Sequence, residues 1–284
     1  MPSIGDSDAF KDSRRILSQH QAALTILQDR LSNPETTTFR WLDLACGRGQ
    51  IICNLAQNLS QEARKKLHYE AYDIEQQFVR EVMKDVDQLG LASHDAKIGA
   101  IHDFSQLYKN SDRFDLITFT NTIHEVRPDH FGNLLSDCVR HLSPHGTLFI
   151  YDMERINPPE LGAVAWTKEE VTAIIRSFCQ ALGVPTYLPE VGRWHHASCE
   201  GWNVHLVRTH LRVSDEELVA RTGTIADQVR DTIRGLLTDK LNKCRLALES
   251  LTRGGGGTTS QETEQRQRLL HDFWALNRAL RVLV

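Results

Sequence analysis

The sequence predicts an α/β protein built on a parallel sheet that helices cover on both faces. Three observations lead to this fold class. Strand and helix patterns alternate from residue 39 to about residue 182, as expected for parallel strands joined by helical crossovers. A glycine-rich turn, ACGRGQ, separates the first strand from the first helix. The stretch WHHASCEGWNVHLVRTHL (194–211) then supplies one or two strands with no helix between them, which predicts antiparallel pairing at the sheet edge.

The strands of this sheet can be placed in order along the chain. They are expected at FRWLDLA (39–45), HYEAYDI (68–74), AKIGAIHDF (96–104), FDLITFT (114–120) and TLFIYDM (147–153). Helices are expected at GQIICNLAQNL, at the pattern of Phe78, Val82, Val86 and Leu89, and over roughly 129–142. A further helix begins at a capping box of Thr167 and Glu170 and ends at Gly183.

Helical patterns also flank the sheet region at both ends. An amphipathic helix is expected over 8–31, and two apolar helical stripes follow Ser214 on either side of RGGGGTTSQ. We therefore divide the chain into an N-terminal helical segment (1–34), an α/β domain (35–212) and a C-terminal helical hairpin (213–284). The C-terminal stripes need a partner surface. They either cover the active-site mouth or mediate a homodimer, which we favour slightly, or the hairpin folds entirely onto its own domain.

Composition narrows the class of protein. The 284 residues, 40% hydrophobic and 25% charged, suit a globular chain with a sizeable core. A formal net charge of −4 offers no basic surface for duplex nucleic acid, which argues against that substrate. The six scattered cysteines contain no C-x-x-C pair, and no apolar run approaches the ~20 residues of a membrane span. With no signal-peptide pattern at the N-terminus, we expect a cytoplasmic protein that does not enter a membrane.

The glycine-rich turn and two acids predict a nucleoside-bearing cofactor. Ligands of open α/β sheets bind at the carboxyl ends of the strands. Asp43 lies just before the turn there, and Asp73, at the end of the second strand, is placed to hydrogen-bond ribose hydroxyls. ACGRGQ lacks the G-x-G-x-x-G spacing of dinucleotide sites and the Lys-Ser/Thr pair of a triphosphate loop.

The segment LDLACGRG resembles motif I of the class I S-adenosylmethionine-dependent methyltransferases, with Ala45 in place of the first glycine. The resemblance extends over about residues 39–210, through Asp73 in AYDIE, Asp103 and Phe104 in HDF, motif IV in FDLITFTNTIHEV, and LSPHGTLFIYD. It implies a Rossmann-like seven-stranded sheet, mostly parallel with its last strand antiparallel. It also implies S-adenosylmethionine as cofactor, S-adenosylhomocysteine as product and no metal. The cofactor-binding residues it implies are Asp43, Ala45, Cys46, Gly47, Gly49, Asp73, Ile74, Asp103, Phe104, Asn121 and Thr122.

The loop NTIHE bears on the reaction. It lacks the Asn/Asp-Pro-Pro-Tyr/Phe signature of DNA and protein-glutamine methyltransferases, and IHEV looks more like small-molecule methyltransferases of the ubiquinone-biosynthesis kind. His124 is a candidate base because its ordinary pKa lies near neutrality, and Glu125 would orient it or bind a cationic substrate. The alternative is that His124 caps the loop without transferring a proton.

Four more residues are candidates for the substrate pocket. Tyr151 and Asp152 end the fifth strand, and Trp194 and His195 begin the edge hairpin. The spacing in RWHHASCEGW matches no standard zinc site, and adjacent histidines on a strand point to opposite faces, so we expect no metal there.

The sequence therefore predicts an S-adenosylmethionine-dependent methyltransferase that transfers a methyl group to O, N or C of a small molecule by direct displacement. Two alternatives remain open: an RNA or protein methyltransferase, and a non-catalytic scaffold or sensor that binds the cofactor.

Overall fold

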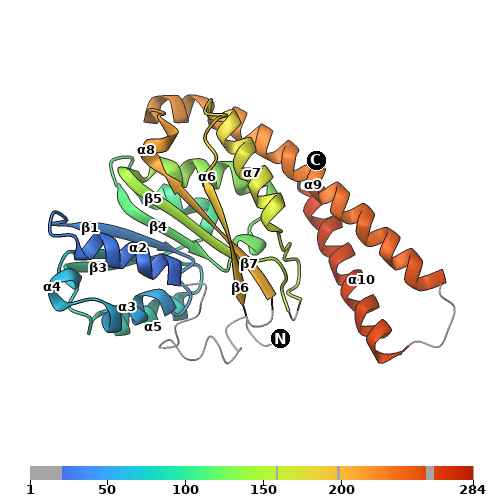
Figure 1. The fold of residues 1–284 in the computed structure, drawn as a ribbon, viewed down its shortest axis with the longest axis horizontal. Helices are drawn as coiled ribbons and strands as arrows, with labels where there is room; N and C mark the ends of the chain where they lie inside the picture. Colours follow the sequence, from blue (N-terminus) through green and yellow to red (C-terminus); the bar gives the residue numbers. More distant parts are fainter. Residues whose placement is uncertain (1–20, 158, 197–198, 254–258, 284) are drawn as a thin grey trace.

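The computed structural model describes residues 21–157, 159–196, 199–253 and 259–283. Its centre is a seven-stranded sheet in the order β3-β2-β1-β4-β5-β7-β6 (Figure 1). The strands are β1 Phe39–Leu44, β2 Leu67–Asp73, β3 Ser93–Ile98, β4 Phe114–Thr120, β5 Leu142–Met153, β6 Glu190–His196 and β7 Cys199–Val207. The first five pair in parallel, and β7 runs antiparallel to both β5 and β6. The predicted Rossmann-like sheet with an antiparallel strand is confirmed.

Two strands, β3 and β5, differ from the prediction by more than one residue. β3 begins at Ser93 and stops at Ile98, and residues Ile101–Leu107 form the 3-10 helix η3 instead of continuing the strand. This edge strand has no buried residue, so no apolar alternation marks its start. β5 begins at Leu142, because SPHG is accommodated as a register shift against β4 rather than as a turn before the strand.

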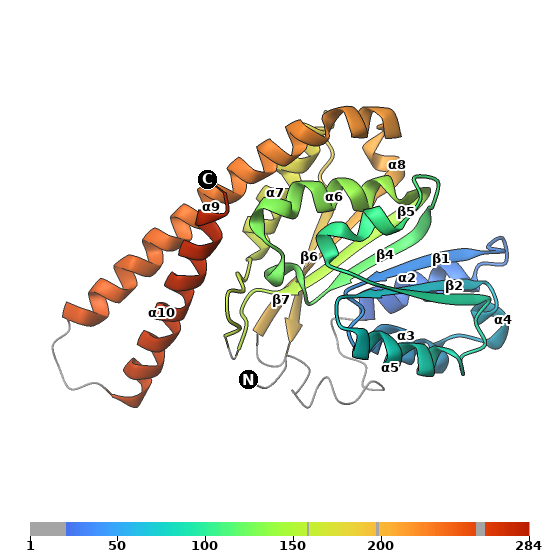
Figure 2. The same cartoon turned by 180° about the vertical axis from the view of Figure 1, so that it is seen from behind.

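Helices cover both faces of the sheet, as predicted. One face packs against four helices: α2 (Gln21–Ser32), α3 (Gln50–Asn58), the short α4 (Gln61–Arg64) and α5 (Gln76–Val86). Figure 1 views the sheet from the side of α2. The other packs against α6 (Phe131–Arg140) and α7 (Lys168–Ala181), and Figure 2 is seen from the side of α6. The capping box of Thr167 and Glu170 opens α7 as expected. Because strand side chains alternate between faces, consecutive residues of one strand belong to different cores.

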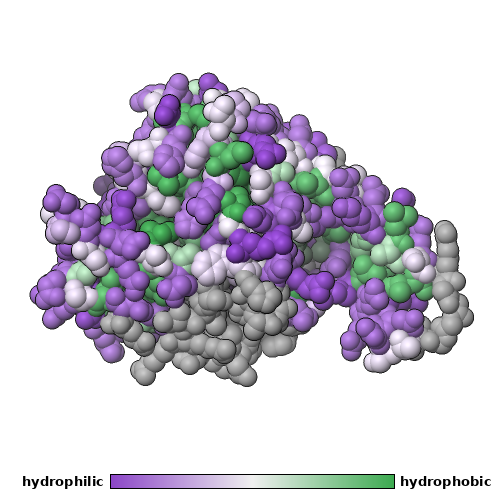
Figure 3. Space-filling model, in the orientation of Figure 1, coloured by the Kyte–Doolittle hydropathy of each residue, from purple (hydrophilic) through white to green (hydrophobic). Residues whose placement is uncertain are grey.

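The C-terminal helices begin on the domain and extend beyond it. After α8 (Arg208–Leu211), α9 (Asp215–Arg253) packs its first half into the core beside α6 and α7, and α10 (Ser260–Arg281) returns along its second half (Figures 1 and 2). Figure 3 shows apolar residues on the surface of this hairpin, and the exposed ones of its two helices include Leu246, Leu270 and Trp274. A second copy of the chain could cover these exposed apolar residues, so the homodimer stays a prediction.

Two further observations concern the described residues. None of their helices, the 39-residue α9 included, has the length and apolarity that a membrane crossing requires. The described cysteines form no disulfide with one another. The predicted N-terminal helix is described only from residue 21, so its first part lies outside the described residues.

Candidate active site

The turn between β1 and α3 forms the first part of the site. Gly47 and Gly49 have positive φ angles of 53° and 68°, which glycine adopts without steric cost. A Cβ built on Gly47 would meet no atom within 4 Å, whereas one on Gly49 would lie 2.9 Å from Cγ2 of Val82. Gly47 therefore presents bare backbone to open space at the carboxyl edge of the sheet. The absence of a side chain at Gly49 is instead what lets α3 pack against α5.

Asp73 connects this turn to the end of β2. Its Oδ2 accepts a hydrogen bond of 2.9 Å from the backbone N–H of Gly47, and its Oδ1 accepts one of 2.9 Å from the N–H of Glu75. The N–H of Cys46 donates to the carbonyl oxygen of Tyr72 at 3.0 Å. The carboxylate is thus fixed at the mouth of the turn. Each of its oxygens keeps a second lone pair that can accept a ribose hydroxyl.

Asp43 lies beneath the turn rather than in it. It is 2% exposed and accepts hydrogen bonds from the hydroxyls of Thr118 at 2.6 Å and Tyr69 at 3.2 Å. Trp41 Nε1 donates to the same Thr118 oxygen at 2.8 Å. Burial raises the pKa of Asp43 to about 7, although both hydroxyls act to lower it. Asp43 therefore joins β1, β4 and β2 under the turn, and its side chain has no path to a ligand.

Strained backbone marks the carboxyl ends of β1 and β4. Ala45 and Asn121 both have a φ of 54°, which is uncommon outside glycine and clusters at functional sites. The Oδ1 of Asn121 is buried and has no hydrogen-bond partner among the described residues. A buried acceptor in this state requires a donor, which a bound ligand can supply. Thr122, next in the chain, donates its hydroxyl to the carbonyl oxygen of Thr120 at 3.1 Å.

The remaining residues expected to bind the cofactor divide into exposed and buried ones. The side chain of Asp103 is 49% exposed in η3, where Gln106 donates to it at 2.9 Å. Ile74, just after Asp73, is 65% exposed, so an apolar side chain lies beside this acid. Phe104 is fully buried against Tyr72. Only its backbone can reach a ligand.

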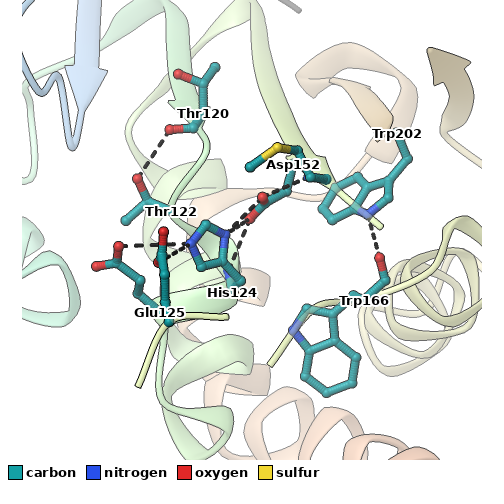
Figure 4. Close-up of polar contacts among 9 residues, drawn as sticks. Thr120, Thr122, His124, Glu125, Asp152, Trp166 and Trp202 are labelled. Atoms are coloured by element: carbon teal, nitrogen blue, oxygen red, sulfur yellow. Dashed lines mark hydrogen bonds and ion pairs between the residues drawn. The ribbon is translucent and has the colours of Figure 1, made fainter. Parts of the chain in front are cut away.

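His124 lies at the centre of a polar cluster beside the β4 end. It sits in the 3-10 helix η4 (Ile123–Glu125) and is 4% exposed. Its Nδ1 is 2.8 Å from both oxygens of Asp152, and its backbone N–H donates to Oδ2 of Asp152 at 3.0 Å. Its Nε2 is 3.1 Å from Oε2 of Glu160 and 3.8 Å from Oε1 of Glu125. Figure 4 shows the imidazole ring between Asp152 on one side and Glu125 on the other. Both ring nitrogens therefore face carboxylates.

The charge state of His124 follows from these neighbours. Burial disfavours the charged ring, but the carboxylates of Asp152 and Glu160 outweigh it and raise the pKa of His124 to about 10. Burial also raises the pKa of Glu125, against the opposite effect of His124. At neutral pH His124 is thus an imidazolium among three acidic side chains.

The four residues expected in a substrate pocket are not brought together. Tyr151 and Asp152 are consecutive on β5 and point to opposite faces, Tyr151 into the α2–α3 core and Asp152 toward His124. Tyr151 is 1% exposed and lines no open space. Trp194 packs on the same face as Tyr151, and the side chain of His195 lies outside the described part of the chain. Of the three whose side chains the structure describes, only Asp152 joins the cluster.

Sequence reasoning missed Glu160. It belongs to the loop between β5 and α7, 36 residues beyond His124, with no local pattern to mark it. The loop is held from two sides. Trp202 Nε1 donates to the carbonyl oxygen of Trp166 at 2.7 Å (Figure 4), and Arg268 of α10 donates to that of Ile156 at 3.0 Å. The C-terminal hairpin therefore fixes the segment that carries Glu160.

Comparison with known proteins gives the class of the domain. The family described as "Methyltransferase domain" matches residues 42–146, from within β1 to the middle of β5. A search among curated proteins finds no significant match.

Several solved structures align with this chain at low sequence identity. The CurJ carbon methyltransferase aligns with a TM-score of 0.51 at 15% identity, over 72% of this chain and 56% of that one. The chain thus spans little more than half the length of that methyltransferase. Magnesium protoporphyrin IX methyltransferase from Synechocystis, solved with bound SAM, aligns with a TM-score of 0.47 at 13% identity, over 66% of this chain and 79% of that one. A SAM-dependent methyltransferase from Aquifex aeolicus aligns with a TM-score of 0.42 at 18% identity, over 67% and 89%. At these identities the likeness concerns the fold.

Proposed function

We propose that this chain, which carries an S-adenosylmethionine-dependent methyltransferase domain, transfers the methyl group to an O, N or C atom of a small molecule. The observation that carries the small-molecule assignment is the number of acidic side chains around His124, where we place the acceptor. Asp152, Glu160 and Glu125 surround the one basic group, His124, beside the β4 end. A field of this sign repels the phosphates of nucleic acid. The resemblance of IHEV to ubiquinone-biosynthesis methyltransferases supports the same assignment.

The residues at the carboxyl edge fit the cofactor. The open face of Gly47 lets backbone approach it, Asp73 offers carboxylate oxygens to the ribose, and exposed Ile74 can lie against adenine. The unpartnered Oδ1 of Asn121 suits a donor such as the ammonium of the methionyl part. When bound, the cofactor supplies an electrophilic methyl group on a sulfonium, and its departure leaves S-adenosylhomocysteine.

The role of the protein's own residues in this reaction is to align the acceptor. A direct displacement needs the nucleophile in line with the methyl–sulfur bond, and positioning alone supplies a large rate enhancement. Both nitrogens of His124 are engaged by carboxylates, which suits an orienting role better than that of the base. Glu125 is half-exposed and is the group we assign to contact the acceptor, by hydrogen bonding to it or removing its proton.

The alternatives have less support from the described residues. An RNA or protein methyltransferase would need a docking surface that tolerates the acidic cluster. A non-catalytic sensor would have no use for a buried His–Asp pair at the mouth of the cofactor site. The acidic cluster therefore counts against an RNA or protein acceptor, and the buried His–Asp pair counts against a sensor.

One experiment separates the three functions. The purified chain is incubated with S-adenosylmethionine and, in parallel, with a small-metabolite extract, total RNA or a protein extract, and S-adenosylhomocysteine is quantified. We expect product only with the metabolite fraction. Product with RNA or protein alone would reject the small-molecule acceptor, and calorimetric binding of S-adenosylhomocysteine without turnover in any fraction would indicate the sensor.

A further inference from the structure

Three ligand atoms of the His124 cluster lie close enough to one another to share a metal ion. His124 Nε2, one carboxylate oxygen of Glu125 and one of Glu160 all lie within 4.8 Å of one another. The histidine nitrogen is 3.1 Å from Glu160 and 3.8 Å from Glu125. Ligands bound tetrahedrally at about 2.1 Å from an ion are separated by about 3.4 Å. To reach that geometry the two glutamate side chains would rotate, and neither is fully buried: the side chain of Glu125 is 41% exposed and that of Glu160 is 28% exposed.

Asp152 gives the histidine the orientation of a metal ligand. It holds Nδ1 at 2.8 Å and also accepts the backbone N–H of His124, so the ring is fixed at two points. Asp152 is itself 1% exposed and comes from the neighbouring strand β5, independently of the two glutamates. A carboxylate on one ring nitrogen with the other nitrogen directed at the ion is the usual arrangement around metal-binding histidines.

The charge of the cluster calls for a cation. Asp152, Glu125 and Glu160 place three carboxylates around one histidine, and no lysine or arginine of the described chain forms an ion pair with any of them. Elsewhere the protein does pair its acids with such groups, as where Arg193 meets Glu154, Glu169 and Glu200. Three carboxylates around a single histidine leave a surplus of negative charge, which is costly unless a further cation binds among them.

We infer that His124, Glu125 and Glu160 form a binding site for a first-row divalent cation, with Asp152 as the residue that positions His124. One nitrogen and two carboxylate oxygens suit Mn²⁺, Fe²⁺, Co²⁺ or Zn²⁺ better than Mg²⁺ or Ca²⁺, which prefer oxygen alone. The three protein ligands leave at least one coordination position for an exogenous oxygen atom. The ion would there hold and acidify a hydroxyl-bearing acceptor, in place of proton removal by Glu125 alone. This replaces the expectation, drawn from sequence, that the site needs no metal.

The test measures metal binding in the absence of S-adenosylmethionine, so its outcome does not depend on methyl transfer. The chelator-treated chain is titrated with Zn²⁺ and Mn²⁺ by calorimetry, and with Co²⁺ by visible absorption, whose intensity and position report coordination number and ligand type. We expect saturation at one ion per chain. Glu160→Gln and Glu125→Gln should each weaken binding at least tenfold and change the Co²⁺ spectrum.

Glu169→Gln is the matched control, because Glu169 is an exposed glutamate that pairs with Arg193 outside the cluster. It should bind metal like the unmodified chain. Thermal unfolding of every variant checks the fold, and binding of S-adenosylhomocysteine to the chelated chain tests the cofactor site separately. Absence of saturable binding, or affinities unchanged in both cluster variants, would overturn the site. A cationic acceptor would then be the better explanation of the surplus carboxylates, and binding of the cofactor would remain unaffected.

Discussion

Alanine substitutions at Gly47 and Gly49 should rank in opposite orders for loss of binding and for loss of stability, although the two glycines are two residues apart in one turn. Each has a positive φ, and a Cβ there costs about 1 kcal/mol of stability. At Gly47 nothing else is lost, because the added carbon meets no atom within 4 Å. At Gly49 the carbon would lie 2.9 Å from Val82 and 3.0 Å from Ile52, which adds about 1–3 kcal/mol of overpacking.

These magnitudes become measurable shifts. For a chain of this size 1 kcal/mol corresponds to roughly 2 °C in Tm, so Gly47→Ala should lower Tm by about 2 °C and Gly49→Ala by about 4–8 °C. Affinity should respond in the reverse order. The Cβ at Gly47 projects where backbone approaches the cofactor, and a methyl group forced into that contact should weaken binding roughly tenfold to a hundredfold. Gly49→Ala should change the affinity by less than about threefold.

Calorimetric titration with S-adenosylhomocysteine at 20 °C, together with scanning calorimetry, measures both quantities on the same samples. Unchanged affinity in Gly47→Ala would refute the assignment of its open face to the cofactor. A larger Tm loss in Gly47→Ala than in Gly49→Ala would show that the packing of α3 against α5 had been misjudged.

Three further predictions concern other parts of the molecule. Asp73→Ala should weaken S-adenosylhomocysteine binding by about 1.5–3 kcal/mol in calorimetry, because it removes hydrogen bonds to a charged group. A loss of affinity below about threefold would mean that the acid that binds the ribose lies elsewhere. The folded-state pKa of Asp43, about 7, exceeds its unfolded value, so its contribution to stability is largest below pH 4 and is lost as pH rises through 7. Asp43→Asn should therefore lose less Tm than the unmodified chain between pH 5 and pH 8, and parallel Tm curves would contradict this. Light scattering should give a mass near twice 32.3 kDa, and the double variant Leu270→Glu, Trp274→Glu should give a monomer, whereas a monomeric unmodified chain would reject the dimer.

Local patterns were enough to predict most of the fold from sequence. β4 occupies the predicted residues, and the capping box of Thr167 and Glu170 opens α7 where expected, because both signals depend on neighbours in the chain. The start of β3 was missed because none of its residues is buried, so no apolar alternation marks it.

The site was predicted less completely for the same reason. The turn at Gly47 and the acid Asp73 have recognisable spacing in the sequence. In the structure the backbone N–H of Gly47 donates a hydrogen bond to the carboxylate of Asp73. The pairing of His124 with Asp152 and Glu160 depends on the order of β4 and β5 and on a loop without regular structure. Such contacts are set by tertiary packing, and a single sequence contains no periodicity that reports them.

The contact of α10 with the loop after β5 has a consequence for how acceptor preference can change. Arg268 holds the carbonyl of Ile156, and Lys240 of α9 pairs with Glu170 at the start of α7, so both ends of the loop that carries Glu160 are anchored to the terminal helices. Within the described residues, no contact of this kind attaches the turn at Gly47 to the terminal helices. Directed evolution toward a new acceptor should therefore accumulate substitutions around Arg268 and Lys240, while the residues around Gly47 stay as they are. Both positions lie more than 70 residues beyond LSPHGTLFIYD, the last motif with a recognisable sequence.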